Sequence, residues 1–129
     1  METKQEIKET ELGIGNEEMV TLKPAIVKVE SVSIDEIPTK KGISKKVVCL
    51  CKHPEKLDLI RISEVKYENK GKLEATGLWI NKDSKGLIRK NSALAVFLQH
   101  TGSLVISNLV GKELPTTTDD KGYLCFKAY

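Results

Sequence analysis

The second half of the chain, residues 73–129, holds one short capped helix between segments of strand-like composition. Asn91 or Ser92 suits the N-cap of this helix, and Gly102 suits the left-handed residue that follows a helix C-terminus. Its apolar stripe has the helical spacing i, i+3, i+4 and consists of Leu94, Phe97 and Leu98. We therefore expect a helix over residues 92–100, with a short second helical turn over 103–109. The remaining ordered segments read as strands, so the chain is predicted to be mainly β with one main helix.

The strand-like segments surround this helix in sequence. They cover residues 25–34, 45–52, 57–67, 72–81, 112–118 and 123–128. In the first of them the apolar side switches at Val32 and Ile34, which indicates a bulge or strong bend of the kind that a barrel strand needs. Residues 38–44 read as a basic loop. The turn over 119–122 closes the last two strands into a hairpin, so the helix is expected just before the last hairpin.

Charge divides the chain into two parts. Residues 1–19 contain six Glu and two Lys, a net charge of −4, whereas residues 20–129 carry 19 basic and 12 acidic side chains, a net charge of +7. The acidic part has too few apolar side chains to offset the entropy lost on ordering. We predict a disordered or flexible acidic arm over residues 1–21 and one domain over 22–129, whose positive charge attracts polyanions.

Compartment and membrane contact are predicted from what the sequence lacks. It has no apolar run of the roughly 20 residues that a membrane span needs, and no signal-peptide pattern at its start. Its three cysteines are too few, and odd in number, for a disulfide framework. We expect a cytoplasmic protein with reduced thiols and no membrane partner.

No catalytic signature stands out, so we predict a protein that is not an enzyme and needs no cofactor. Cys49, Cys51 and His53 alternate along one strand, and Cys125 lies on another, which makes a zinc-stabilised domain one alternative. Alternate side chains on a straight strand stand roughly 7 Å apart, however, whereas zinc holds thiolate sulfur at about 2.3 Å. Because no turn interrupts residues 49–53, we predict no metal site.

Trp79 is the only tryptophan, and three interpretations of it remain open. It fills an aliphatic core, it is a stacking platform for a nucleic-acid base, or it anchors a protein interface. The second interpretation is favoured by cationic side chains on nearby strands, because basic faces with interleaved aromatics are typical of nucleic-acid binding. The predicted binding residues are Lys40, Lys41, Lys45, Lys46, Arg61, Lys66, Tyr67, Lys72, Trp79 and Tyr123.

This layout resembles the oligonucleotide/oligosaccharide-binding (OB) fold, a small β-barrel with a single helix. The runs Ser92-Ala93-Leu94, Leu109-Val110-Gly111-Lys112 and Lys121-Gly122-Tyr123-Leu124 are also similar to the tail of small phage-type and archaeal OB-like proteins that bind single-stranded nucleic acid. The resemblance implies a binding groove across the second and third strands, flanked by the loops at 38–44 and 119–122. Lys40 and Lys41 in the first loop would then contact phosphates.

The function expected from these features is non-catalytic binding of single-stranded nucleic acid, with DNA favoured over RNA. Low sequence specificity is expected because Arg61 and Arg89 are the only arginines, and lysine reads bases poorly. The alternative function is a protein-interaction or structural adaptor module, for example in a viral or replication assembly, without nucleic-acid binding. Under the nucleic-acid-binding function, the acidic arm is expected to shield the groove or to recruit a protein partner by mimicking an anion.

Overall fold

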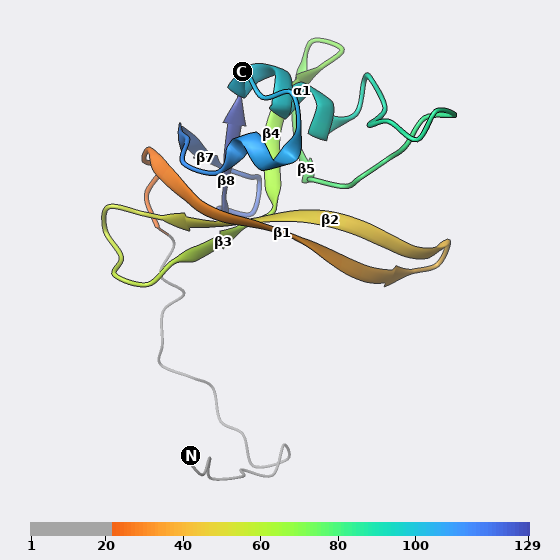
Figure 1. Cartoon of the computed structure of the whole chain (residues 1–129). Helices are drawn as coiled ribbons and strands as arrows, with labels where there is room; N and C mark the ends of the chain where they lie inside the picture. Colours follow the sequence, from red (N-terminus) through yellow and green to blue (C-terminus); the bar gives the residue numbers. More distant parts are fainter. Residues whose placement is uncertain (1–21) are drawn as a thin grey trace, which may run out of the picture.

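A long antiparallel ribbon dominates the computed structural model, which describes residues 22–129 (Figure 1). The ribbon consists of β1, Val27–Thr39, and β2, Gly42–Lys52. The register of β1 against β2 shifts between Val29 and Ser31, so a bulge bends the ribbon as the switching apolar side of this segment indicates. The acidic arm predicted over residues 1–21 lies outside the described residues.

The predicted loop over residues 38–44 is wrong, because the two strands pair as far as Thr39 and Gly42. Only Lys40 and Lys41 form the turn. Lys40 and Lys41 keep negative φ, and Gly42 follows them with a φ of 109°, a conformation that favours glycine directly after such a turn. The basic residues that the sequence places in a loop therefore stand at the end of a projecting ribbon, where the strand pairing fixes their positions.

Six shorter strands complete two curled sheets. They are β3, Ile60–Ile62; β4, Glu64–Asn69; β5, Lys72–Gly77; β6, Glu113–Leu114; β7, Thr116–Thr118; and β8, Leu124–Ala128. The neighbour order is β3-β2-β1-β6 in one sheet and β5-β4-β8-β7 in the other. Only Ser63 separates β3 from β4, and only Pro115 separates β6 from β7, so the chain turns from one sheet to the other at these two corners. The sheets curl into an OB-like half-barrel.

Two predicted strands are corrected by this arrangement. The segment predicted over 57–67 is divided at Ser63, and residues 57–59 lie before its first strand. The segment predicted over 72–81 leaves its hairpin after Gly77 and then pairs with β2, since the N–H of Val47 donates to Leu78 O and the N–H of Ile80 donates to Lys45 O. This change of partner brings the end of the segment against the ribbon.

The helix forms as its caps predict. α1 covers Ala93–Thr101, the Ser92 hydroxyl accepts a hydrogen bond from the N–H of Ala95 at 3.2 Å, and Gly102 closes the helix at a φ of 73°. A 3-10 helix, η2, follows over Ile106–Leu109. Because α1 precedes the β7–β8 hairpin, the prediction of a mainly β fold with one helix before the last hairpin is confirmed.

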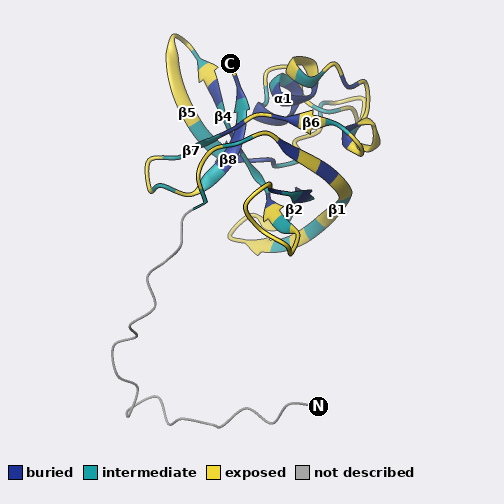
Figure 2. Ribbon diagram, turned by 90° about the vertical axis from the view of Figure 1, so that its left-hand side faces the viewer, coloured by how far each residue is buried: buried dark blue, intermediate teal, exposed yellow. Residues whose placement is uncertain are grey.

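The core lies between the two sheets and beneath α1, and it is aliphatic with one aromatic pair (Figure 2). Phe97 of α1 stacks on Phe126 of β8 with ring centroids 4.8 Å apart. β8 runs parallel to β4, which places Phe126 opposite Val65. This closed interior fixes which side chains of β2 and β4 point outward.

Candidate nucleic-acid interface

Lys46 and Trp79 meet on the outer side of the ribbon. Val47, Cys49 and Cys51 of β2 point into the core, so Lys46, which alternates with them, points outward. Trp79 pairs directly with Lys46, and the Lys46 Nζ lies 5.1 Å from the centroid of the indole ring. This is a cation–π distance. Trp79 is partly exposed and lies outside the core cluster, so the core interpretation of this residue is wrong.

Gly77 makes room for this pair. A Cβ atom at Gly77 would stand 2.6 Å from Trp79 Nε1 and 2.7 Å from Lys46 Cε, closer than carbon atoms pack. A glycine inside a strand often marks such a close approach. The indole can therefore lie against the strand with its ring beside the lysine stem. We call Lys46, Gly77 and Trp79 the indole platform.

The end of the ribbon is strongly positive. Residues 37–54 contain five lysines and no carboxylate. Lys40, Lys41 and Lys45 are exposed there, and Lys46 adds the fourth cation next to the platform. The nearest acidic side chains are on β1, where Glu36 pairs with Lys45 and Asp35 with Lys46. We call Lys40, Lys41, Lys45 and Lys46 the ribbon-end lysines.

Asp35 is engaged elsewhere. Its carboxylate forms an ion pair with the Arg61 guanidinium of β3 at 2.6 Å, the one salt bridge within residues 22–129. This pair crosses the outer face of β2, because Asp35 comes from β1 and Arg61 from β3. Asp35 thus neutralises Arg61, which the sequence predicts as a binding residue, and the ribbon-end lysines carry the remaining positive charge.

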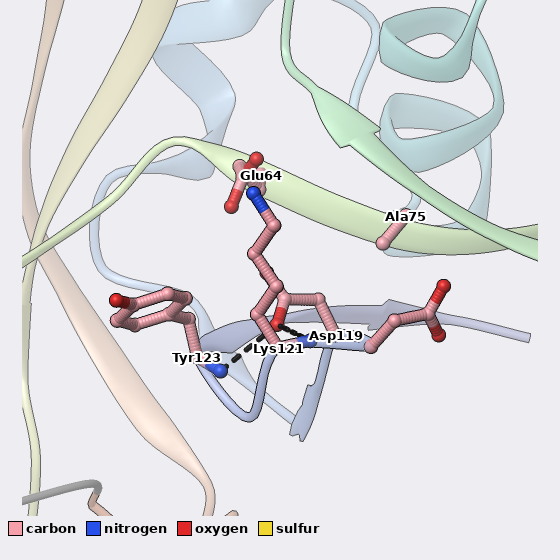
Figure 3. A pocket seen from close by; sticks show the side chains of 6 residues that line it. Glu64, Ala75, Asp119, Lys121 and Tyr123 are labelled. Carbon is pink, nitrogen blue, oxygen red and sulfur yellow. Dashed lines mark hydrogen bonds between the residues drawn. The ribbon is translucent and has the colours of Figure 1, made fainter.

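The loop between β7 and β8, which the resemblance places beside the groove, borders an acidic pocket. A polar pocket of about 390 Å³ lies beside it, and Glu64, Ala75, Asp119, Asp120, Lys121 and Tyr123 line this pocket (Figure 3). The Asp119 carboxylate accepts hydrogen bonds from the N–H groups of Lys121 and Tyr123, both at 2.9 Å, which shapes the turn. Three carboxylates against one lysine disfavour a phosphate, so this loop is not a basic flank of a groove.

Several predicted binding residues lie apart from the platform. Tyr67 is only 8% exposed because it alternates inward with Val65 on β4, so the prediction that it contacts nucleic acid is wrong. Lys66 belongs to the second sheet, and its Nζ donates to Thr118 O at 3.3 Å. Lys72 begins β5 at the far end of the β4–β5 hairpin, and Tyr123 lines the acidic pocket. The structure therefore brings Lys46 and Trp79 together, whereas Lys40 and Lys41 lie further along the ribbon at its turn and Lys45 points to the opposite face.

Gly77 is the residue of the indole platform that the sequence analysis did not single out. The signal was present, because a glycine two positions before the only tryptophan in a strand-like segment shares its face. The partner across the sheet, Lys46, could not be recognised in the same way. Lys46 is 33 positions from Trp79 in sequence, and the pairing of these two residues depends on the change of strand partner after Gly77.

The residues of the zinc alternative are buried and satisfied by other contacts. Burial raises the pKa of Cys49 to about 12 and that of Cys125 to about 11. Burial, reinforced by Cys49 and Glu30, raises the pKa of Cys51 to about 12. His53 Nδ1 accepts from the N–H of Glu55 at 3.0 Å, so its Nε2 carries the proton and donates to Lys23 O at 2.8 Å. Over residues 22–129 no three His, Cys, Asp or Glu side chains are placed to hold a metal ion.

No family model matches the chain, and neither a curated protein nor a solved structure shows significant similarity to it. The OB-like character therefore rests on strand order and helix position. In the described part of the chain, none of the helices has the length and apolar character required to cross a bilayer.

Proposed function

We propose that the protein binds single-stranded nucleic acid along the outer side of its β1–β2 ribbon, without catalysis and with little sequence preference. The observation that carries this proposal is the indole platform on a ribbon whose residues 37–54 include five lysines and no carboxylate. The ribbon-end lysines supply sequence-independent attraction to phosphates. The partly exposed indole supplies a face on which any base can stack.

Two further features support this function. An OB-like barrel uses the outer face of its second and third strands for oligonucleotides, and Trp79 continues the sheet next to β3 on that face. Lysine outnumbers arginine, so phosphate attraction dominates over base reading. We infer that the ligand is DNA in preference to RNA, in a cytoplasmic setting that keeps the buried thiols reduced.

A fluorescence-anisotropy titration with labelled oligo(dT) and oligo(rU) at low salt tests the proposal. The native chain should bind oligo(dT) at micromolar protein or below, more tightly than oligo(rU). Its affinity should fall with salt with a slope of about −0.7 per phosphate contact on single strands. No binding to either oligonucleotide at micromolar protein would contradict the proposal, and stronger binding of oligo(rU) would contradict the preference for DNA.

A matched pair of variants locates the interface. Lys40→Ala/Lys41→Ala removes two exposed charges from the ribbon end, and Lys82→Ala/Lys85→Ala removes two exposed charges from the loop before α1. Both variants have the same net charge. The ribbon variant should lose two phosphate contacts, which reduces the salt slope by about 1.4. The loop variant should behave like the native chain, and equal losses in both would indicate attraction by net charge alone.

A structural adaptor remains the second candidate, because the ribbon end also exposes aliphatic side chains. Ile43 is 70% exposed and Ile34 is 42% exposed. Both lie on the same face of the ribbon as the core residue Val47. Exposed aliphatic residues of this kind are typical of protein contacts. If this candidate is right, the chain elutes as an oligomer that Ile43→Asp dissociates, and oligonucleotide leaves Trp79 emission unchanged.

A further inference from the structure

An apolar cleft lies on the helical part of the molecule, separate from the indole platform. It has a volume of about 590 Å³ and opens between the loop before α1, α1 itself and η2. Its apolar lining consists of Leu87, Ile88, Leu98, Leu104, Val105 and Ile106. Leu104 is 93% exposed, Leu87 63% and Val105 53%. Large exposed aliphatic side chains that gather around one cleft mark an interaction site.

The chain segments that form this cleft are basic in sequence. Residues 84–112 contain four basic side chains, Lys85, Arg89, Lys90 and Lys112, and no carboxylate. The nearest acidic residue in sequence is Asp83, whose carboxylate accepts hydrogen bonds from the N–H groups of Lys85 and Leu87 and so belongs to the turn. An occupant of this cleft should therefore combine aliphatic side chains with negative charge.

The chain itself contains a segment of this chemistry. Residues 1–19 carry a net charge of −4 with aliphatic side chains at Ile7, Leu12 and Ile14. The described part begins at Leu22, so 21 residues precede it. That length spans up to roughly 70 Å when extended. A domain of this size has a radius of gyration of about 13 Å, so the cleft is within reach.

We propose that the cleft between the loop at 86–88, α1 and η2 binds the acidic N-terminal segment of the same chain. The aliphatic side chains of the segment fill the cleft, and its glutamates face Lys85, Arg89 and Lys90. The acidic segment then does not compete for the ribbon end, because it is held on a different surface. This inference is independent of the proposed nucleic-acid binding, and its test needs no oligonucleotide.

A spin label on the full chain tests the proposal. Thr10→Cys introduces a thiol outside the domain, whereas the three native thiols are fully buried and do not react. A nitroxide attached at this position should broaden the NMR signals of Leu87, Leu104 and Val105. It should leave the signals of Lys40 and Lys41 sharp. Broadening centred on the ribbon end, or no selective broadening, would overturn the proposal.

Two controls complete the experiment. Leu104→Asp should abolish the broadening at Leu87, whereas Leu57→Asp should preserve it, since both leucines are 93% exposed and only Leu104 lines the cleft. Broadening that survives in Leu104→Asp contradicts binding in the cleft. In a mixture of spin-labelled chain with isotope-enriched chain that lacks the label, the enriched signals should stay sharp. Their broadening would show that a second copy occupies the cleft and would contradict binding within one chain.

Discussion

Replacing Gly77 with alanine tests whether close packing at this glycine holds the indole platform in place. The new methyl group would stand 2.6 Å from Trp79 Nε1 and 2.7 Å from Lys46 Cε. Lys46 can move its flexible stem, but the indole is rigid and must shift as a whole. Gly77 lies outside the left-handed region of φ, so alanine introduces no backbone strain there. The effect is therefore one of packing.

The size of the effect follows from two opposing contributions. Inserting a methyl group into a packed site costs about 1–3 kcal/mol. Replacing glycine with alanine at a compatible backbone returns about 0.4–1 kcal/mol, because the unfolded chain loses freedom. We expect Gly77→Ala to destabilise the fold by about 1 kcal/mol. For a domain of this size that lowers Tm by about 4 °C.

Circular dichroism gives the Tm, and tryptophan emission reports on the platform alone because Trp79 is the only tryptophan. The emission maximum of Gly77→Ala should shift as the indole moves. In the Lys46→Ala background, Gly77→Ala should cost less stability than it does in the native chain, since one of the two clashing groups is then absent. Unchanged Tm and emission in Gly77→Ala would refute the close packing described for this site.

Two further predictions concern the core. Phe126→Ala removes the ring that stacks on Phe97, and it should lower the free energy of unfolding in urea by about 3–5 kcal/mol; a loss below about 1 kcal/mol would contradict the burial of this ring. The buried thiols should make the fold sensitive to alkali. Burial raises the pKa of Cys49 in the folded chain to about 12, against 9.0 for a free thiol. As the pH rises, the Cys49 thiol therefore loses its proton in the unfolded chain before it does so in the folded chain. The free energy of unfolding should therefore keep its full value below about pH 9. Between pH 9 and pH 12 it should fall by up to about 1.4 kcal/mol per pH unit for each thiol. Cys49→Ala should show a shallower decline in urea midpoints between these values, and an equal decline would contradict the prediction.

The local features of the fold could be predicted from the sequence because each depends on neighbouring residues. Ser92 and Gly102 mark the ends of α1 through backbone hydrogen bonds and a left-handed φ that need no tertiary contact. The bulge in β1 was visible in the switch of its apolar side near Val32. These signals sufficed for the fold class.

The assembly of the site depends on contacts between distant segments, which the sequence pattern does not contain. Trp79 faces Lys46 because the chain leaves its hairpin after Gly77 and joins β2. Arg61 is neutralised by Asp35 across an intervening strand. Tyr67 differs from these cases, because its alternation with Val65 already indicated an inward side chain.

We expect one strand of nucleic acid to contact Trp79 and Lys46 and to extend towards Lys40 and Lys41 at the turn of the ribbon. Trp79 emission during titration with unlabelled oligo(dT) tests whether the strand contacts the indole platform, since a base stacked on the indole quenches this emission. We expect saturable quenching at low salt that is reversed as salt is added and that is weakened in Lys40→Ala/Lys41→Ala. Emission that stays constant while the oligonucleotide binds would show that the ligand lies elsewhere on the molecule.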